Sequence, residues 1–137
     1  MTSPIRQGET VAGRQFGPFG AEDVAAYALA SGDDNPLHVD PTIAAKAGLA
    51  GVPIHGMLIM ACFESFLREW REDVLVRKLS SKFIRPVLID EAFEVSGKVV
   101  RVDAGDAVLR LMVKRAGLPA ELVCMAEAFV SAAAAVS

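Results

Sequence analysis

Apolar residues recur along this chain with two different periods. Between residues 21 and 31 they follow a helical spacing, and Glu22 and Asp23 stand in the first turn, where acidic groups favour the helix dipole. Gly32 occupies the position of a C-terminal cap. The pattern predicts a helix over residues 21–31, preceded by a short strand within residues 8–19 that ends in a Gly-Pro turn.

The segment from His55 to about Arg71 is apolar on almost every face over its first two turns. A helix that is hydrophobic all round must be covered all round. At 1.5 Å per residue it would extend roughly 24 Å, which is enough to run along the face of a small sheet. One sheet covers only one side of such a helix, so we expect something else to cover the other.

The last part of the chain alternates between apolar and polar residues, as Leu109 and Leu111 illustrate. The alternation predicts strands over residues 74–84, 91–102, 106–115 and 121–131. Turn residues interrupt it at 103–106 and 117–119, and Gly97 predicts a bulge or a tight bend. Helices followed by antiparallel strands predict an α+β fold with the helices on one face of the sheet.

Composition narrows the class of protein. The chain has 137 residues, the size of one domain, so we expect a single domain over residues 1–137. Its hydrophobic fraction of 53% exceeds the roughly 45–50% of an average soluble domain, which indicates a subunit interface or an apolar pocket. A net charge of −3 argues against nucleic acid as a partner. Without a signal-like N-terminus or an apolar run of ~20 residues, we expect a cytoplasmic protein with no membrane partner.

Cys62 and Cys124 are the only cysteines, and both lie among apolar neighbours. We interpret them as buried free thiols, because free cysteine packs as a small hydrophobic residue. The two cysteines and two histidines show no metal-ligand spacing, so we expect no metal site.

Residues 31–41, SGDDNPLHVDP, are unusually polar for this chain. Asp40 followed by Pro41 is a matched start signal, an aspartate N-cap before proline at the first helical position. It predicts a short helix that stops at Gly48. The polar stretch is then a loop of about eight residues held between two helices, a setting that can fix side chains in place.

Asp33, Asn35 and His38 are the side chains of this loop that suit acid–base chemistry. Pro36 fixes its own φ and pushes Asn35 toward extended geometry, so few dihedrals are free between Asp33 and His38. Two proton-passing groups held on one water can add that water to a double bond. If the double bond is conjugated to a thioester, the enolate-like oxygen needs a donor, which the Gly56 N–H at a helix start would supply.

Each residue also has a plainer interpretation. An aspartate that follows glycine is commonly a turn residue, and a lone histidine is commonly a half-buried packing residue. Asp33 and His38 could therefore have structural roles alone, while Asp34 is expected to be a solvated acid and Asp40 a helix cap. The residues by themselves leave hydration chemistry as one alternative among several.

The segment YALASGDDNPLHVDPTIAAKAG, followed by GVPIHGML, resembles the signature of the MaoC-like (R)-specific enoyl-CoA hydratases and 3-hydroxyacyl-thioester dehydratases. The matching positions are Tyr27, Ser31, Gly32, Asp33, Asn35, Pro36, Leu37, His38, His55, Gly56 and Met57. The resemblance implies the hot-dog fold, an antiparallel sheet wrapped around one long helix. It also implies a homodimer, or a higher oligomer of dimers, whose sheets join edge to edge.

The resemblance implies a lyase of fatty acid metabolism that reversibly hydrates a trans-2-enoyl thioester to an (R)-3-hydroxyacyl thioester. Asp33 and His38 would be its catalytic pair, the Gly56 N–H its donor to the thioester carbonyl, and Asn35 a supporting residue. Coenzyme A or the phosphopantetheine of an acyl carrier protein would belong to the acyl-thioester substrate, with no separate cofactor. A hot-dog acyl-CoA thioesterase and a non-catalytic thioester-binding or dimerisation module remain open as alternatives.

Two segments depart from the family pattern. The link from Pro53 to His55 is one residue shorter than in many relatives, and the motif from Pro86 to Glu91 has Asp90 where many relatives have glycine.

A basic stretch of the chain is a candidate binding surface for the phosphates of the carrier. The alternative is an ordinary solvated helix end, whose cations favour the C-terminal dipole. The stretch comprises Arg68, Arg71, Arg77, Lys78, Lys82 and Arg85.

Overall fold

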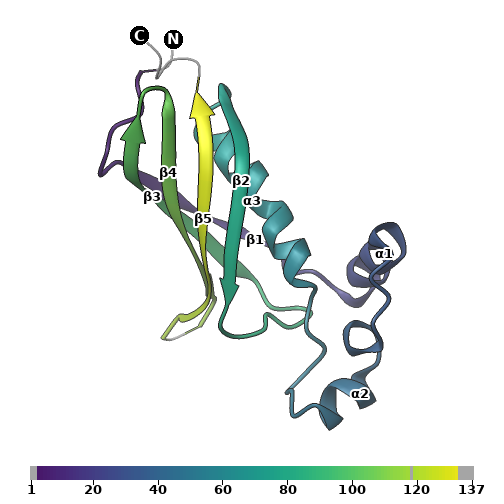
Figure 1. Cartoon of the computed structure of the whole chain (residues 1–137). Coiled ribbons are helices and arrows are strands. Elements are labelled where there is room, and N and C mark those ends of the chain that lie inside the picture. The colour runs from purple at the N-terminus through teal and green to yellow at the C-terminus, as the bar shows by residue number, and fades with distance from the viewer. Residues whose placement is uncertain (1–2, 118, 133–137) are drawn as a thin grey trace.

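A five-stranded antiparallel sheet lies against one long helix in the computed structural model, which describes residues 3–117 and 119–132 (Figure 1). The strands are β1 (Thr10–Phe16), β2 (Val74–Phe83), β3 (Phe93–Asp103), β4 (Asp106–Arg115) and β5 (Glu121–Ala132). Their order in the sheet is β1-β3-β4-β5-β2, so that β1 and β2 form the two edges. The strands β2 to β5 begin and end within two residues of the predicted positions, and β1 lies inside the predicted range of 8–19.

Within the described part of the chain, four helical segments lie between β1 and β2 in the sequence. They are α1 (Ala21–Ser31), the 3₁₀ turn η1 (Pro36–His38), α2 (Pro41–Lys46) and α3 (Gly56–Trp70). The long helix α3 runs along one face of the sheet, and α1, η1 and α2 lie beside its N-terminal end (Figure 1). This arrangement confirms the predicted α+β fold, with the polar loop at the point where α3 begins.

The predicted cap and turn signals operate as expected. Gly32 adopts a left-handed conformation with φ of 78°, and its N–H donates to the Ala28 carbonyl, which ends α1. The Asp40 side chain accepts a hydrogen bond from the Thr42 N–H at 2.9 Å and caps α2. The turn predicted at 117–119 includes residue 118, which lies outside the described residues.

Gly97 is needed for close packing rather than for a bulge of its own strand. The register between β1 and β3 does shift beside it, but the extra residue belongs to β1, between Val11 and Arg14. A Cβ built on Gly97 would lie 3.0 Å from Leu111 Cδ2 and 3.4 Å from Phe66 Cε2. Glycine therefore lets a side chain of α3 approach the sheet.

The helix α3 is covered on one side only. The side chains that it buries are Ile59, Cys62, Phe63, Phe66 and Leu67. Met57, in the first turn, is 60% exposed. The sheet thus covers one face of the helix, as predicted, and leaves part of the first turn open to a second cover.

Both cysteines are buried free thiols, as predicted. Burial raises the pKa of Cys62 to about 11, although the nearby positive charge of Arg14 opposes the shift. Burial also raises the pKa of Cys124. No helix in the described part of the chain is long and apolar enough to cross a membrane.

Candidate active site

The loop after α1 contains one ordered turn that the sequence interpretation left as irregular chain. Asn35 caps this turn, η1, because its Oδ1 accepts a hydrogen bond from the Leu37 N–H at 3.0 Å. Pro36 follows at the first position of the turn, where its fixed φ fits and its missing N–H is not needed. The turn returns His38 toward Asp33.

Asp33 and His38 come together as predicted, and His55 joins them. One carboxylate oxygen of Asp33 and one ring nitrogen from each histidine all lie within 4.8 Å of one another. The loop residue Asp33 is exposed, His38 is half-buried, and His55 is only 1% exposed. A small polar centre thus forms between the loop and the start of α3.

One hydrogen bond of the His38 ring fixes its tautomer. Its Nδ1 lies 2.8 Å from the Pro53 carbonyl oxygen. A carbonyl oxygen can only accept, so Nδ1 of the neutral ring carries the proton and Nε2 keeps its lone pair. His38 therefore presents a proton acceptor at Nε2.

His55 is held in a similar way. Its Nε2 lies 3.0 Å from the backbone oxygen of Asp33, so this nitrogen is the donor. Its ring stacks on His38, with centroids 4.0 Å apart, and tilts against Tyr27 at 4.8 Å. Its Nδ1 is buried and has no hydrogen-bond partner among residues 3–117 and 119–132, a situation that costs about 1–3 kcal/mol.

The sequence interpretation matched His55 to the family pattern at the start of a helix but gave it no role, and so missed its part in this cluster. The available signals were this match and its identity as one of just two histidines in the chain. The cluster could also offer ligands to a metal ion. One nitrogen of each histidine faces a carbonyl oxygen, so each ring has a single nitrogen left for a metal. Only the other ring nitrogens and the Asp33 carboxylate are open for coordination.

Gly56 is the first residue of α3 and lines a groove of about 380 Å³. The first N–H groups of a helix have no partner within it, and the Leu58 N–H is the first in α3 to reach the His55 carbonyl. The Gly56 N–H comes two residues before the Leu58 N–H, so the helix itself offers it no acceptor. A Cβ on Gly56 would lie 3.0 Å from Phe83 Cζ, so the ring of Phe83 closes over this glycine.

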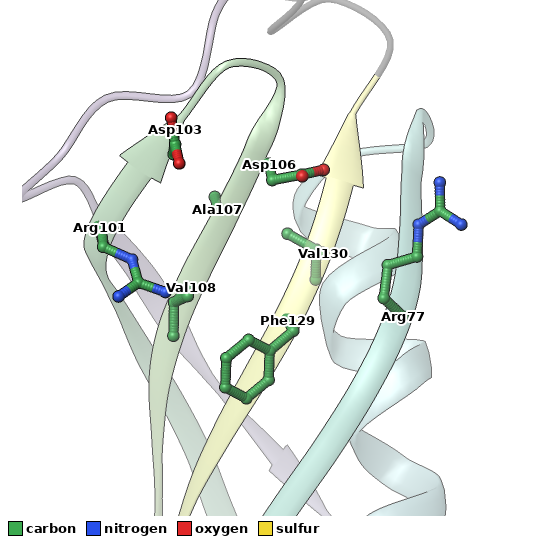
Figure 2. A pocket seen from close by; sticks show the side chains of 8 residues that line it. All are labelled: Arg77, Arg101, Asp103, Asp106, Ala107, Val108, Phe129 and Val130. Carbon is green, nitrogen blue, oxygen red and sulfur yellow. The ribbon is translucent and has the colours of Figure 1, made fainter.

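A second hollow, of about 340 Å³, lies on the face of the sheet away from α3 (Figure 2). Arg77 and Arg101 lie at its margin, and Phe129 forms part of its floor (Figure 2). Arg77 Nε donates to Ser131 Oγ at 3.0 Å, and that hydroxyl donates to Asp106 Oδ1 at 2.6 Å. Arg77 therefore binds side chains of the sheet itself, and the lining of this hollow includes none of Asp33, His38 and Gly56.

The basic stretch does not form one surface. Arg71 is buried and pairs with Asp73 at 2.9 Å, so it is not part of a solvated helix end. Arg77 lies on the outer face of the sheet (Figure 2). Arg85, in contrast, lines the groove beside Gly56.

The structure accounts for both departures from the family pattern. Asp90 replaces the expected glycine with φ of 66°, in the left-handed region where glycine is unstrained, and its N–H donates to the Phe19 carbonyl at 2.8 Å. Pro53 forms an isolated bridge with Leu88. The shorter link after Pro53 still places His55 directly before α3.

A family model described as MaoC like domain matches residues 3–117. The chain is 34% identical over 101 residues to the mitochondrial 3-hydroxyacyl-[acyl-carrier-protein] dehydratase of Arabidopsis thaliana, which covers 74% of this chain and 60% of that relative. It is 47% identical over 49 residues to the (R)-specific enoyl-CoA hydratase of Aeromonas caviae, covering 36% of this chain and 37% of that one. In both alignments, this chain spans less than two thirds of the relative's length.

Solved structures agree with the fold. The (R)-hydratase from Aeromonas caviae involved in PHA biosynthesis matches with a TM-score of 0.82 at 29% identity, covering 93% of this chain and 97% of that one. A protein from Archaeoglobus fulgidus matches with a TM-score of 0.84 at 23% identity, covering 96% and 81% respectively, and shows the fold alone. The likeness confirms the hot-dog fold. Because the family model spans most of the sequence, from before β1 to the end of β4, the chain belongs to the MaoC-like domain family.

Proposed function

We propose that the protein is a lyase that reversibly adds water to a trans-2-enoyl thioester, giving an (R)-3-hydroxyacyl thioester. The observation that carries this proposal is the convergence of the Asp33 carboxylate and the His38 ring within 4.8 Å, from positions that match the family motif. The relatives named as a hydratase and a dehydratase support it, since the two activities are one reaction in opposite directions.

In the proposed reaction, Asp33 and Nε2 of His38 are both hydrogen-bond acceptors. A water molecule has two O–H donors, so one water can bridge them. As the water oxygen bonds to C3 of the substrate, one of its protons passes to this pair, and a proton is delivered from the pair to C2. The double bond is consumed, with hydroxyl added at C3 and hydrogen at C2.

The Gly56 N–H is our candidate for the group that binds the thioester carbonyl. Negative charge builds on that oxygen as C3 is attacked, and an N–H at a helix N-terminus stabilises such charge. Gly56 lines the apolar groove with Phe83, which offers room for an acyl-thioester beside this donor. Asn35 would support the site through η1, the turn that it caps.

We also propose that a second copy of the chain completes the molecule, as a homodimer or an oligomer of dimers. The strand β2 is an edge of the sheet with no partner on its outer side among the described strands. Phe83 and Ile84, at its end, are 44% and 45% exposed, and Met57 is also uncovered. Light scattering on the purified protein should give a mass of two chains or an even multiple, and a monomer would contradict this part of the proposal.

The test of activity is purified protein with a short trans-2-enoyl-CoA. Hydration removes the conjugated double bond, so the ultraviolet absorbance of the enoyl thioester should fall without release of free thiol. Release of thiol would indicate a thioesterase instead. No change with several chain lengths would indicate a non-catalytic binding module, and either result would refute the proposed lyase.

A further inference from the structure

We propose that His55 is a positioning residue that holds the backbone of Asp33 in place through its Nε2–H. This inference rests on the proposed function for its meaning in catalysis. Its structural part, that His55 orders the loop at Asp33, stands on the geometry alone.

The hydrogen bond from His55 Nε2 to the Asp33 carbonyl, at 3.0 Å, joins two residues that are 22 positions apart. His55 is also the residue directly before Gly56. One side chain therefore connects the start of the acid–base loop to the start of α3. The candidate acid–base pair and the candidate carbonyl donor would then keep one relative geometry.

His55 also limits the movement of His38. The two rings stack with centroids 4.0 Å apart and an angle of 23° between their planes. On another side, His38 Nδ1 is tied to the Pro53 carbonyl at 2.8 Å. With a stacked ring and a hydrogen bond, the lone pair on His38 Nε2 has a defined direction.

Packing alone does not explain a histidine at this position. Nδ1 of His55 is buried without a partner in the described structure, and a buried acceptor of this kind costs free energy. A non-polar side chain of similar size would avoid that cost. The histidine is therefore better explained by what its other nitrogen, Nε2, holds.

Two substitutions separate the roles of the ring nitrogens. In His55→Gln the amide nitrogen is three bonds from Cβ, as Nε2 is, so it can still donate to the Asp33 carbonyl. In His55→Asn the polar atoms are two bonds from Cβ, at the distance of Nδ1, and cannot reach it. Tyr27, His38 and the start of α3 are unchanged in both variants.

We expect His55→Asn to lower kcat toward crotonyl-CoA about a hundredfold with a much smaller change in KM, since misplacement by ~1 Å can cost that much. His55→Gln should keep kcat within about tenfold of the wild type. Hydrogen–deuterium exchange over residues 33–38 should quicken in His55→Asn and remain near the wild-type rate in His55→Gln.

Equal rates of hydrogen–deuterium exchange over residues 33–38 in His55→Asn and His55→Gln would overturn the proposal. So would an equal loss of kcat in both variants that follows a loss of thermal stability. If the wild-type protein does not hydrate enoyl thioesters, the proposed function fails. The exchange comparison would still decide whether His55 orders the loop at Asp33.

Discussion

The rings of His38 and His55 stack at 4.0 Å, although one belongs to the loop after α1 and the other stands at the N-cap position of α3. The ring of His38 donates an N–H hydrogen bond to the Pro53 carbonyl, and the ring of His55 donates one to the Asp33 carbonyl. These two hydrogen bonds fix both the tautomer and the orientation of each ring. The chemistry of the site therefore depends on side chains that the fold orients from two separate segments.

Removing either candidate acid–base group should abolish most of the activity and spare the fold. Asp33 is exposed and His38 is half-buried, so neither Asp33→Asn nor His38→Ala removes core packing. General acid–base catalysis typically contributes about 10²–10⁴-fold, and we expect kcat to fall by that order in each variant. Steady-state kinetics with an enoyl-CoA and a thermal melt would measure both effects.

Asp34→Asn is the matched control for this experiment, because it removes the same charge one residue away in an exposed position. Its kcat should stay near that of the wild type. Near-normal turnover in Asp33→Asn or His38→Ala would refute the assignment of that residue.

Local signals in the sequence were enough to predict the elements that frame the site. Asp40 caps α2 and Gly32 ends α1 through contacts within a few residues, so the chain encodes them locally. The convergence of Asp33 and His38 was also predictable, since the intervening Pro36 restricts the loop. These features depend little on the rest of the fold.

Features that depend on tertiary packing could not be predicted in the same way. The contact of His55 with the Asp33 carbonyl requires the start of α3 to lie against the loop, and no local pattern specifies that placement. That Met57 lies on the uncovered side of α3 could not be predicted, because hydropathy shows which residues are apolar but not which face the sheet covers. The positive φ of Asp90 was not predicted either, although the glycine that many relatives have at this position was a signal for it.

A methyl group on Gly56 should disturb the carbonyl-binding end of the groove. The added Cβ would lie 3.0 Å from Phe83 Cζ, which forces the ring to shift. We expect Gly56→Ala to lower kcat/KM by roughly tenfold, with a change in the free energy of unfolding of about 1 kcal/mol or less, because Phe83 is partly exposed and can move. Adding Phe83→Leu should recover part of the loss, and an unchanged kcat/KM in Gly56→Ala would contradict the role of this groove.

Arg85 should matter for the carrier part of the substrate, while Arg77 should not. Arg85 lines the groove at Gly56, and Arg77 lies on the other face of the sheet. We expect Arg85→Glu to raise KM for an enoyl-CoA several-fold by repelling its phosphates, an effect that weakens with added salt. Arg77→Glu makes the same change in charge as a control, and an equal rise of KM in both variants would show that position does not matter.

Asp90 should tolerate glycine better than alanine. At φ of 66° a Cβ is strained, and aspartate as a residue type adopts this region more readily than alanine. We expect Asp90→Ala to lower the free energy of unfolding by about 1 kcal/mol, and Asp90→Gly to leave it nearly unchanged because the relief of strain offsets the added entropy of the unfolded chain. Urea denaturation would measure both values. Equal stability of the two variants would mean that the backbone here is not strained.

The buried thiol of Cys62 should make the fold less stable in alkali. Burial raises its pKa to about 11 in the folded protein, whereas in the unfolded chain the thiol ionises near its usual value. Between these two values the folded state binds more protons than the unfolded state, so the free energy of unfolding falls as the pH rises. We expect Cys62 to contribute at most about 3 kcal/mol to that fall, since each unit of pKa difference is worth ~1.4 kcal/mol. When the free energy of unfolding is measured from pH 8 to 11, it should therefore fall less steeply with pH in Cys62→Ala than in the wild type. An equal dependence on pH in the two proteins would contradict the raised pKa.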